Sequence, residues 1–443
     1  MAGDGRGPLR GRRWRFSVRP TPRAARALKS LQLPAFWLLG LIMLAGVARL
    51  LEILRTDLAR FPIATTSAVL LFALYAVPFW LFIASMDFLE REPPLLMATA
   101  FAWGGAVATT AAIPGTQAVH DLVAKLISPA FAATWGSAIA GPTIEELLKA
   151  LGVVMIVLVA RKQINSVLDG MVYGALIGLG YQVVEDIVFA VNAVALRGQG
   201  DGVGPVVATF FLRGFLAGLW SHTLFTALAG AGIAWFVVRT DKPMWWRLGG
   251  LGLGLGLAWL THFVWNSPLF ADGLGSGAAG VLLGMLGKGL PALAMVLALL
   301  WVARHREAHY YVAQLARLHD RNIATPGELQ IMGHGHLRAD ARRYGRARCG
   351  RAGERAVRGL QTAQARFAVE LSRVDHIAPG DMLLVHCRDE VLAQRQRLVN
   401  LGHPEAVVSP MRPAVPRVVV LGALFAVALF LLIWQAIRHL NAA

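Results

Sequence analysis

Ionisable side chains lie inside four apolar segments of this chain. Glu145 and Glu146 occur in the segment GPTIEELLKALG, and Glu185 occurs in GLGYQVVEDIVFA. His222 and His262 occur in LWSHTLFTA and WLTHFVWNS. A charged side chain inside a membrane costs several kcal/mol, so such residues are usually paired, hydrated or functional. Because carboxylates and neutral imidazoles are typical ligands of hydrolytic zinc sites, these segments predict a hydrolytic site inside a membrane.

The expected helices place these groups at similar depth. Each group lies roughly 15–18 residues from the end of its helix that we expect to be cytoplasmic, which is roughly 22–27 Å along a helix. Since the apolar core of a bilayer is about 30 Å thick, all four groups are expected in its outer half.

The glutamate pair also has a structural interpretation. Thr143 and Glu146 have the spacing of a capping box, and Lys149 is close enough in a helix to pair with either glutamate. Adjacent helical positions point about 100° apart, so only one of the two glutamates can face a given site squarely. We favour Glu146 as ligand or base, and Glu145 is almost equally suitable.

Glu185 and His262 each have a second polar residue four positions away in the sequence. Tyr181 shares a helix face with Glu185, and Asn266 shares one with His262. A purely structural alternative for Glu185 is neutralisation by protonation or by a buried partner such as Arg213. An asparagine amide at this spacing could donate a hydrogen bond to a developing oxyanion.

Two mechanisms fit these residue types. In the first, a metal ion, with Zn²⁺ the best match, is bound by Glu146, Glu185, His222 and His262. In the second, a glutamate activates water directly while a histidine stabilises the oxyanion. The glycine-rich run LGGLGLGLGL has no preceding strand and lies in an apolar helix, so we expect no organic cofactor.

The composition predicts an all-α membrane protein. Of the 443 residues, 56% are hydrophobic and only 16% are charged, and the mean hydropathy is +0.54. Such a chain is typical of a helical membrane bundle. About nine membrane helices are expected, at 34–54, 66–86, 95–113, 143–160, 167–195, 206–238, 247–268, 279–303 and 417–437. A further amphipathic or re-entrant stretch is expected at 120–141, ending at Gly141–Pro142.

Charge distribution predicts four domains and their orientation. The net charge of +17 is concentrated in the N-terminus and in residues 304–416. Positive loops favour the cytoplasmic side, and this explains the basic segments better than nucleic-acid binding does. We therefore expect a multi-pass protein of the plasma membrane. Its predicted domains are a cytoplasmic tail (1–33), a catalytic bundle of about eight helices (34–303), a basic and mostly helical soluble cytoplasmic insertion (304–416) and a last membrane helix (417–437).

The motifs, taken in order, resemble those of the PrsW family of membrane-embedded proteases. The chain has E-E-L-L-K at Glu145–Lys149, Y-x-x-x-E at Tyr181–Glu185, and then His222 and His262. The H-x-x-x-N of His262 and Asn266 resembles a motif of the related CAAX prenyl protease superfamily. The resemblance covers about residues 140–270. It implies a peptidase that cleaves membrane-tethered regulators, such as anti-sigma factors, near the outer side of a bacterial membrane.

The sequence therefore predicts an intramembrane peptidase with Glu145, Glu146, Glu185, His222 and His262 as catalytic residues. Lys149, Tyr181 and Asn266 are expected to support them. Its partners would be a membrane protein substrate and the lipid bilayer, with no nucleic acid. Two alternatives stay open: a proton- or ion-coupled transporter, and a non-catalytic scaffold that anchors residues 304–416.

Overall fold

A computed structural model describes residues 31–86, 92–218, 221–270, 277–372, 382–403 and 405–407. Within these residues the chain is helical and contains no strand, which confirms the all-α prediction. The elements are α2 (Pro34–Arg60), α3 (Pro62–Met86), α4 (Pro94–Ala102), the π-helix η1 (Trp103–Ala108), α5 (Thr109–Leu126), α6 (Pro129–Ala160), the 3₁₀-helix η2 (Arg161–Gln163), α7 (Val167–Arg197), α8 (Gly204–Thr209), the π-helix η3 (Phe210–Ala217), α9 (His222–Val238), α10 (Met244–Asn266), α11 (Gly277–Ala316), α12 (Pro326–Met332), α13 (Gly335–Ser372) and α14 (Met382–Asn400).

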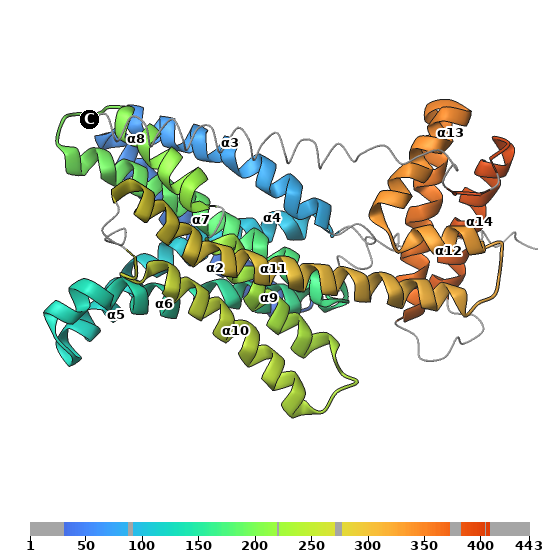
Figure 1. Ribbon diagram of the computed structural model, residues 1–443, viewed down its shortest axis with the longest axis horizontal. Coiled ribbons are helices and arrows are strands. Elements are labelled where there is room, and N and C mark those ends of the chain that lie inside the picture. Colours follow the sequence, from blue (N-terminus) through green and yellow to red (C-terminus); the bar gives the residue numbers. More distant parts are fainter. Residues whose placement is uncertain are drawn as a thin grey trace, which may run out of the picture.

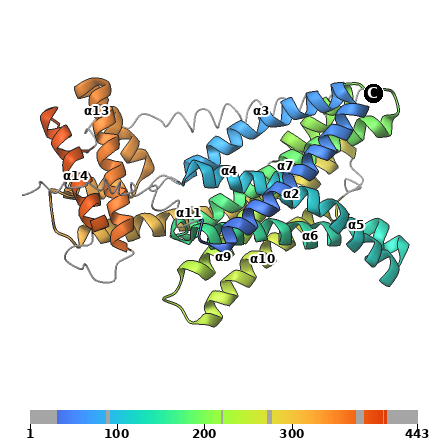
Figure 2. The ribbon, with the colours of Figure 1, turned by 180° about the vertical axis from the view of Figure 1, so that it is seen from behind.

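The helices form a long bundle with a smaller helical group at one end. Helices α2 to α11 make the bundle, α12 to α14 gather beyond its end, and α11 runs from one to the other (Figure 1). The view from behind shows the same division (Figure 2). Buried apolar residues form two clusters, one between Leu39 and Ala303 and one between Ala308 and Ala406. The predicted domain boundaries themselves stay predictions.

Within the described residues, six helical segments are long and apolar enough to cross a membrane, or up to seven if the bent pair α8–η3 and α9 forms one span. The chain is thus a multi-pass membrane protein. Helix α6 is not among the six segments, although it has 32 residues and packs against α5 and α10. It carries Glu145, Glu146 and Lys149, and their charge lowers its hydropathy. The ninth expected helix, 417–437, lies outside the described residues.

The beginning of α6 corrects two expectations. The helix starts at Pro129 and continues through Pro142, so no re-entrant segment ends at Gly141–Pro142. Proline is tolerated inside membrane helices because neighbouring helices and Ser or Thr side chains satisfy the backbone groups that it leaves unpaired. The N-cap is Ser128, whose Oγ accepts a hydrogen bond from the Phe131 amide at 3.1 Å. Thr143 lies inside the helix and donates to the Ile139 carbonyl at 2.6 Å, so the capping-box alternative was wrong.

The expected single helix at 206–238 is interrupted. A short helix, α8, continues into the π-helix η3, and α9 begins at His222 with Ser221 as its N-cap residue. π-helical turns are uncommon and occur often at functional sites, because they change the direction in which side chains point. The interruption places His222 in the first turn of a helix rather than in the middle of one.

Glycines bring α7 and α9 into backbone contact. A Cβ atom on Gly174 would lie 2.3 Å from the Thr226 carbonyl oxygen. A Cβ atom on Gly178 would lie 2.2 Å from the His222 carbonyl oxygen. Only glycine allows this approach, as the four-residue repeat of glycines in α7 predicts. This packing holds His222 against α7, within hydrogen-bonding distance of Glu185.

Candidate functional site

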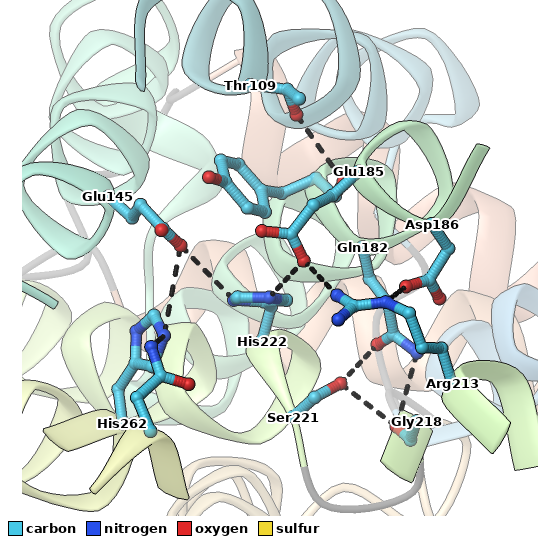
Figure 3. A network of polar contacts seen from close by, with 12 residues as sticks. Thr109, Glu145, Gln182, Glu185, Asp186, Arg213, Gly218, Ser221, His222 and His262 are labelled. Atoms are coloured by element: carbon cyan, nitrogen blue, oxygen red, sulfur yellow. Dashed lines mark hydrogen bonds and ion pairs between the residues drawn. The ribbon is translucent and has the colours of Figure 1, made fainter. Parts of the chain in front are cut away.

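Two histidines face the same carboxylate oxygen deep in the bundle. Glu145 Oε2, on α6, lies 3.8 Å from His222 Nδ1 on α9 and 3.8 Å from His262 Nε2 on α10. Figure 3 shows the three side chains converging from their separate helices. All three residues are buried, with exposed fractions of 6% or less. The site therefore exists only because α6, α9 and α10 pack together.

A second carboxylate contacts each histidine at the ring nitrogen that points away from Glu145. His262 Nδ1 lies 2.8 Å from Glu146 Oε1, and His222 Nε2 lies 3.1 Å from Glu185 Oε2. An imidazole that hydrogen-bonds a carboxylate through one nitrogen is fixed in tautomer and orientation, and its other nitrogen becomes a better ligand. In both histidines that other nitrogen is the one nearest to Glu145.

Lys149 supplies the positive charge in the middle of this group. Its fully buried Nζ lies 2.6 Å from Glu146 Oε1 and 2.8 Å from His222 Nδ1. It also lies 4.2 Å from the centroid of the Tyr181 ring, which in turn packs 4.8 Å from the His222 ring. Thus Lys149 and Tyr181, two of the three residues that were expected to support the site, contact it directly.

Asn266 completes the α10 side of the site. Its Nδ2 lies 3.1 Å from His262 Nε2, one helical turn along α10. A Cβ atom at Gly141 on α6 would lie 3.0 Å from this amide nitrogen and 3.2 Å from Glu145 Oε1. The amide donor and the central carboxylate are therefore neighbours, and the absence of a side chain at Gly141 leaves room for both.

Glu185 has a second partner outside the histidine group. The Arg213 guanidinium, on η3, donates to Glu185 Oε2 and to Asp186 Oδ1, each at 2.5 Å (Figure 3). The ion pair that we considered as a structural alternative for Glu185 is thus present. It does not exclude a role at the site, because the same carboxylate oxygen also lies within hydrogen-bonding distance of His222.

Several polar contacts were not predicted from the sequence. Thr226 Oγ donates to Glu146 Oε2 at 3.3 Å, and Ser221 Oγ donates to Gln182 Oε1 at 2.7 Å. Arg213 was considered only as a counter-charge, although an arginine in an apolar segment is itself a sign of an intramembrane polar network. Thr226 shares a helix face with His222, which is the signal that could have placed it near the site.

The residues fit a divalent metal ion. Glu145, His222 and His262 each offer a ligand atom within 4.8 Å of the others. Two ligands of one tetrahedral zinc ion stand roughly 3.4 Å apart, close to the observed 3.8 Å. Among the described residues no group donates a hydrogen bond to Glu145 Oε2, although this atom is buried. A buried carboxylate oxygen is normally satisfied, and a metal ion would satisfy it.

The formal charges of the site also match a divalent cation. Four acidic residues, Glu145, Glu146, Glu185 and Asp186, are linked with two basic ones, Lys149 and Arg213. With the carboxylates ionised and the histidines neutral, the group has two negative charges in excess. Uncompensated charge in a low-dielectric interior is unfavourable, and one divalent ion would remove the excess.

The ligand set suggested by this geometry differs from the expected one. The sequence favoured Glu146 and Glu185 together with the histidines, whereas the three-residue group contains Glu145. Glu146 and Glu185 instead contact the histidine nitrogens that point away from Glu145. The reason is the helix geometry noted above, since the 100° between adjacent residues of α6 turns Glu145 and Glu146 to opposite sides of His262.

One comparison with known proteins gave a match. Residues 92–302 match the family model described as PrsW family intramembrane metalloprotease. The match covers every residue of the site, and it confirms the resemblance that the motifs indicated and the prediction of a membrane peptidase. The comparisons with curated proteins and with solved structures gave no match.

Proposed function

We propose that this chain, whose residues 92–302 belong to the PrsW family of intramembrane metalloproteases, hydrolyses a peptide bond of a membrane-tethered protein at Glu145, His222 and His262. One observation carries this proposal. Each histidine points one nitrogen at a carboxylate and the other at the same oxygen of Glu145. This is the arrangement of ligands and supporting carboxylates that a catalytic zinc site needs.

In this proposal Glu145, His222 and His262 hold one Zn²⁺ ion. When bound, the ion polarises the scissile carbonyl and makes water a stronger acid. Three protein ligands leave a position for water or substrate. The set resembles other catalytic zinc sites of two histidines and one carboxylate in its donor atoms.

The remaining residues orient the reacting groups. Glu146 and Glu185 keep the two imidazoles in the tautomer whose other nitrogen has a free lone pair to offer the ion. In this structure Lys149 donates to that nitrogen of His222 and Asn266 to that of His262, so both donors would turn aside when the ion binds. Lys149 neutralises Glu146 and keeps that carboxylate next to His262. Asn266 is close enough to the ligand group for its amide to donate a hydrogen bond to the carbonyl oxygen as negative charge develops there.

The substrate we propose is a membrane-tethered regulatory protein such as an anti-sigma factor. A site enclosed by membrane helices is reached most easily by a segment that is itself in or beside the bilayer. The predicted depth places the cut in the outer half of the membrane. We further propose that the protein resides in the plasma membrane, with its N-terminus and residues 304–416 in the cytoplasm.

New protein N-termini test the activity and identify the substrate. Membranes are compared from cells with equal amounts of the wild type, Glu145→Gln or Glu52→Gln. Glu52 is an exposed partner of Arg49 on α2 and serves as the matched control. We expect termini near a membrane segment of the substrate in the wild type and the Glu52 variant only. The same termini with Glu145→Gln would contradict the proposal.

Metal content tests the ligand assignment separately. We expect about one Zn²⁺ per purified wild-type chain and loss of the metal in His262→Ala. A strong chelator should abolish cleavage of the identified substrate, and added Zn²⁺ should restore it. Full activity after complete removal of metal would instead support the glutamate mechanism, in which Glu145 takes the proton of the attacking water.

A further inference from the structure

A basic cavity lies at the end of the bundle that faces helices α12 to α14. Its volume is about 390 Å³. Figures 1 and 2 both show the connection between α9 and α10 at this end. The lining residues come from the end of α9, the connection, the start of α10, and α11; they are Trp235, Arg239, Asp241, Lys242, Pro243, Trp246 and Arg306.

The lining carries an excess of positive charge. Arg239 forms two hydrogen bonds with Asp241, Nε to Oδ1 and Nη2 to Oδ2, each at 2.7 Å. These bonds lower the pKa of Asp241 to about 2, so this carboxylate stays ionised and occupied by Arg239. Lys242 lies 3.7 Å from the same carboxylate, and Arg306 has no acidic partner among the described residues. Three basic groups therefore face one acidic group.

Other basic residues at this end have structural roles that Lys242 and Arg306 lack. Arg161 donates to the Val237 carbonyl at 2.8 Å, and Arg247 donates to the Phe236 carbonyl at 2.7 and 2.9 Å. Both arginines satisfy carbonyl groups at the C-terminal end of α9, where the helix would otherwise leave acceptors without donors. The charge on Lys242 and Arg306 is not needed for this purpose.

Tryptophans place the cavity at the boundary between bilayer and water. Trp245 and Trp246 begin α10 and are 66% and 52% exposed. Trp235 donates from Nε1 to the Trp246 carbonyl at 3.2 Å, and the Arg239 guanidinium lies 4.8 Å from the Trp235 ring. Tryptophan is enriched where membrane helices pass through the headgroup layer. A ligand of this cavity would thus lie at headgroup level.

We propose that this cavity binds the phosphate of an anionic phospholipid, with Lys242 and Arg306 as its main cationic contacts. Basic pockets between membrane helices bind anionic headgroups because the phosphate is neutralised in a region of lowered dielectric. Arg239 is held in place by Asp241 and Trp235 and offers its remaining N–H groups without further ordering. The site is separate from Glu145 and its histidines, so this inference does not rest on the proposed peptidase mechanism.

Native mass spectrometry of the full chain in detergent tests the proposal. The wild type is titrated with phosphatidylglycerol or phosphatidylcholine, and retained lipid is counted at each concentration. We expect tighter retention of phosphatidylglycerol. In Lys242→Gln/Arg306→Gln its affinity should fall about 30-fold, because each basic residue near the membrane surface contributes about 1 kcal/mol.

Two variants control for charge and folding. Arg351→Gln/Arg355→Gln removes two charges from exposed positions of α13 and should retain the lipid as the wild type does. Lys242→Arg/Arg306→Lys keeps the charge and should keep most of the affinity. Equal retention of both lipids, or equal loss in the α13 variant, would overturn the proposal. Displacement of the lipid by glycerol phosphate at comparable concentration would also overturn it, since the site would then recognise a soluble phosphate.

Discussion

The membrane bundle buries Glu145, and the helical group beyond it buries Glu328. The two carboxylates differ in the hydrogen bonds that they accept. Glu328, at the start of α12, has every oxygen occupied. Its Oε1 accepts hydrogen bonds from Arg395 at 3.1 Å and the Ala406 amide at 3.0 Å. Its Oε2 accepts them from Arg395 at 2.6 Å, Gln364 at 2.8 Å and the Thr325 amide at 3.1 Å.

Glu145 is also buried, but it has no such set of donors at Oε2. Lys149 Nζ lies 3.7 Å from this oxygen, and one nitrogen of each imidazole lies 3.8 Å from it. A carboxylate that stabilises a fold has its lone pairs satisfied by the protein, because an unsatisfied buried acceptor destabilises it. A carboxylate that binds a ligand must keep one oxygen for that ligand. Under the proposed function, this difference separates a structural acid, Glu328, from a metal ligand, Glu145.

The largest expected effect comes from exchanging the two glutamates for glutamine. In Glu145→Gln we expect cleavage of the substrate to fall by about three orders of magnitude or more, because the anionic ligand of the site is lost. The matched change Glu328→Gln should leave the turnover number of the folded protein unchanged. Turnover is measured with purified chain at saturating substrate, normalised to folded protein. Comparable losses in both variants would remove the distinction between the two carboxylates.

The second effect concerns stability, and here we expect the larger loss in Glu328→Gln rather than in Glu145→Gln. In Glu328→Gln, Arg395 keeps its charge in a site where its side chain is only 11% exposed. Breaking a buried ion pair in this way costs about 3 kcal/mol or more. We expect the free energy of unfolding of residues 304–407 to fall by about this amount.

Labelling of a buried thiol measures that loss in the full chain. Cys387 is 2% exposed and lies in the second apolar cluster, and it is not joined to Cys349 by a disulfide bond. In a Cys349→Ser background, Glu328→Gln should accelerate labelling of Cys387 on the order of 100-fold, since exposure requires local unfolding. Glu405→Gln, at an exposed position, is the control. Unchanged labelling in Glu328→Gln would show that its hydrogen bonds contribute little.

A smaller effect is expected for the carboxylates behind the histidines. Glu146→Gln and Glu185→Gln should each weaken metal binding about 10- to 100-fold, because the imidazoles lose their orienting acceptors. Competition with a chelator of known affinity measures this change, with Glu52→Gln as control. Complete loss of metal in either variant would mean that the residue is a ligand, as the sequence had favoured.

The smallest effect concerns the space beside Glu145. Gly141→Ala should lower the turnover number about tenfold with normal metal content, because the added methyl group displaces Asn266 and Glu145 by a fraction of an ångström. Gly252→Ala adds a methyl group to α10 where nothing lies within 4 Å and should have no effect. Unchanged turnover in Gly141→Ala would argue against a role for the Asn266 amide.

The sequence predicted the kind of fold and the region of the site well. Hydropathy alone indicates membrane helices, and the presence of Glu145, Glu146, Glu185, His222 and His262 in apolar segments marks them because burying charge is unfavourable. Gly170, Gly174 and Gly178 of α7 recur every four residues, a spacing that allows close helix packing, and α9 lies against them. Predictions from local sequence patterns were wrong at Thr143, which is not an N-cap, and in 206–238, which is not one continuous helix. There, packing with neighbouring helices carries α6 through Pro142, while the chain before His222 forms a π-helix.

What the sequence by itself determined is therefore an all-α membrane peptidase and the residues that meet at its centre. Only the tertiary structure decided how these residues contact one another. It turned Glu145 toward both imidazoles, placed Glu146 and Glu185 behind them, and brought Arg213 to Glu185. The physical reason is that helix periodicity fixes which residues share a face, whereas the rotation of each helix depends on the packing of α6, α7, α9 and α10 together.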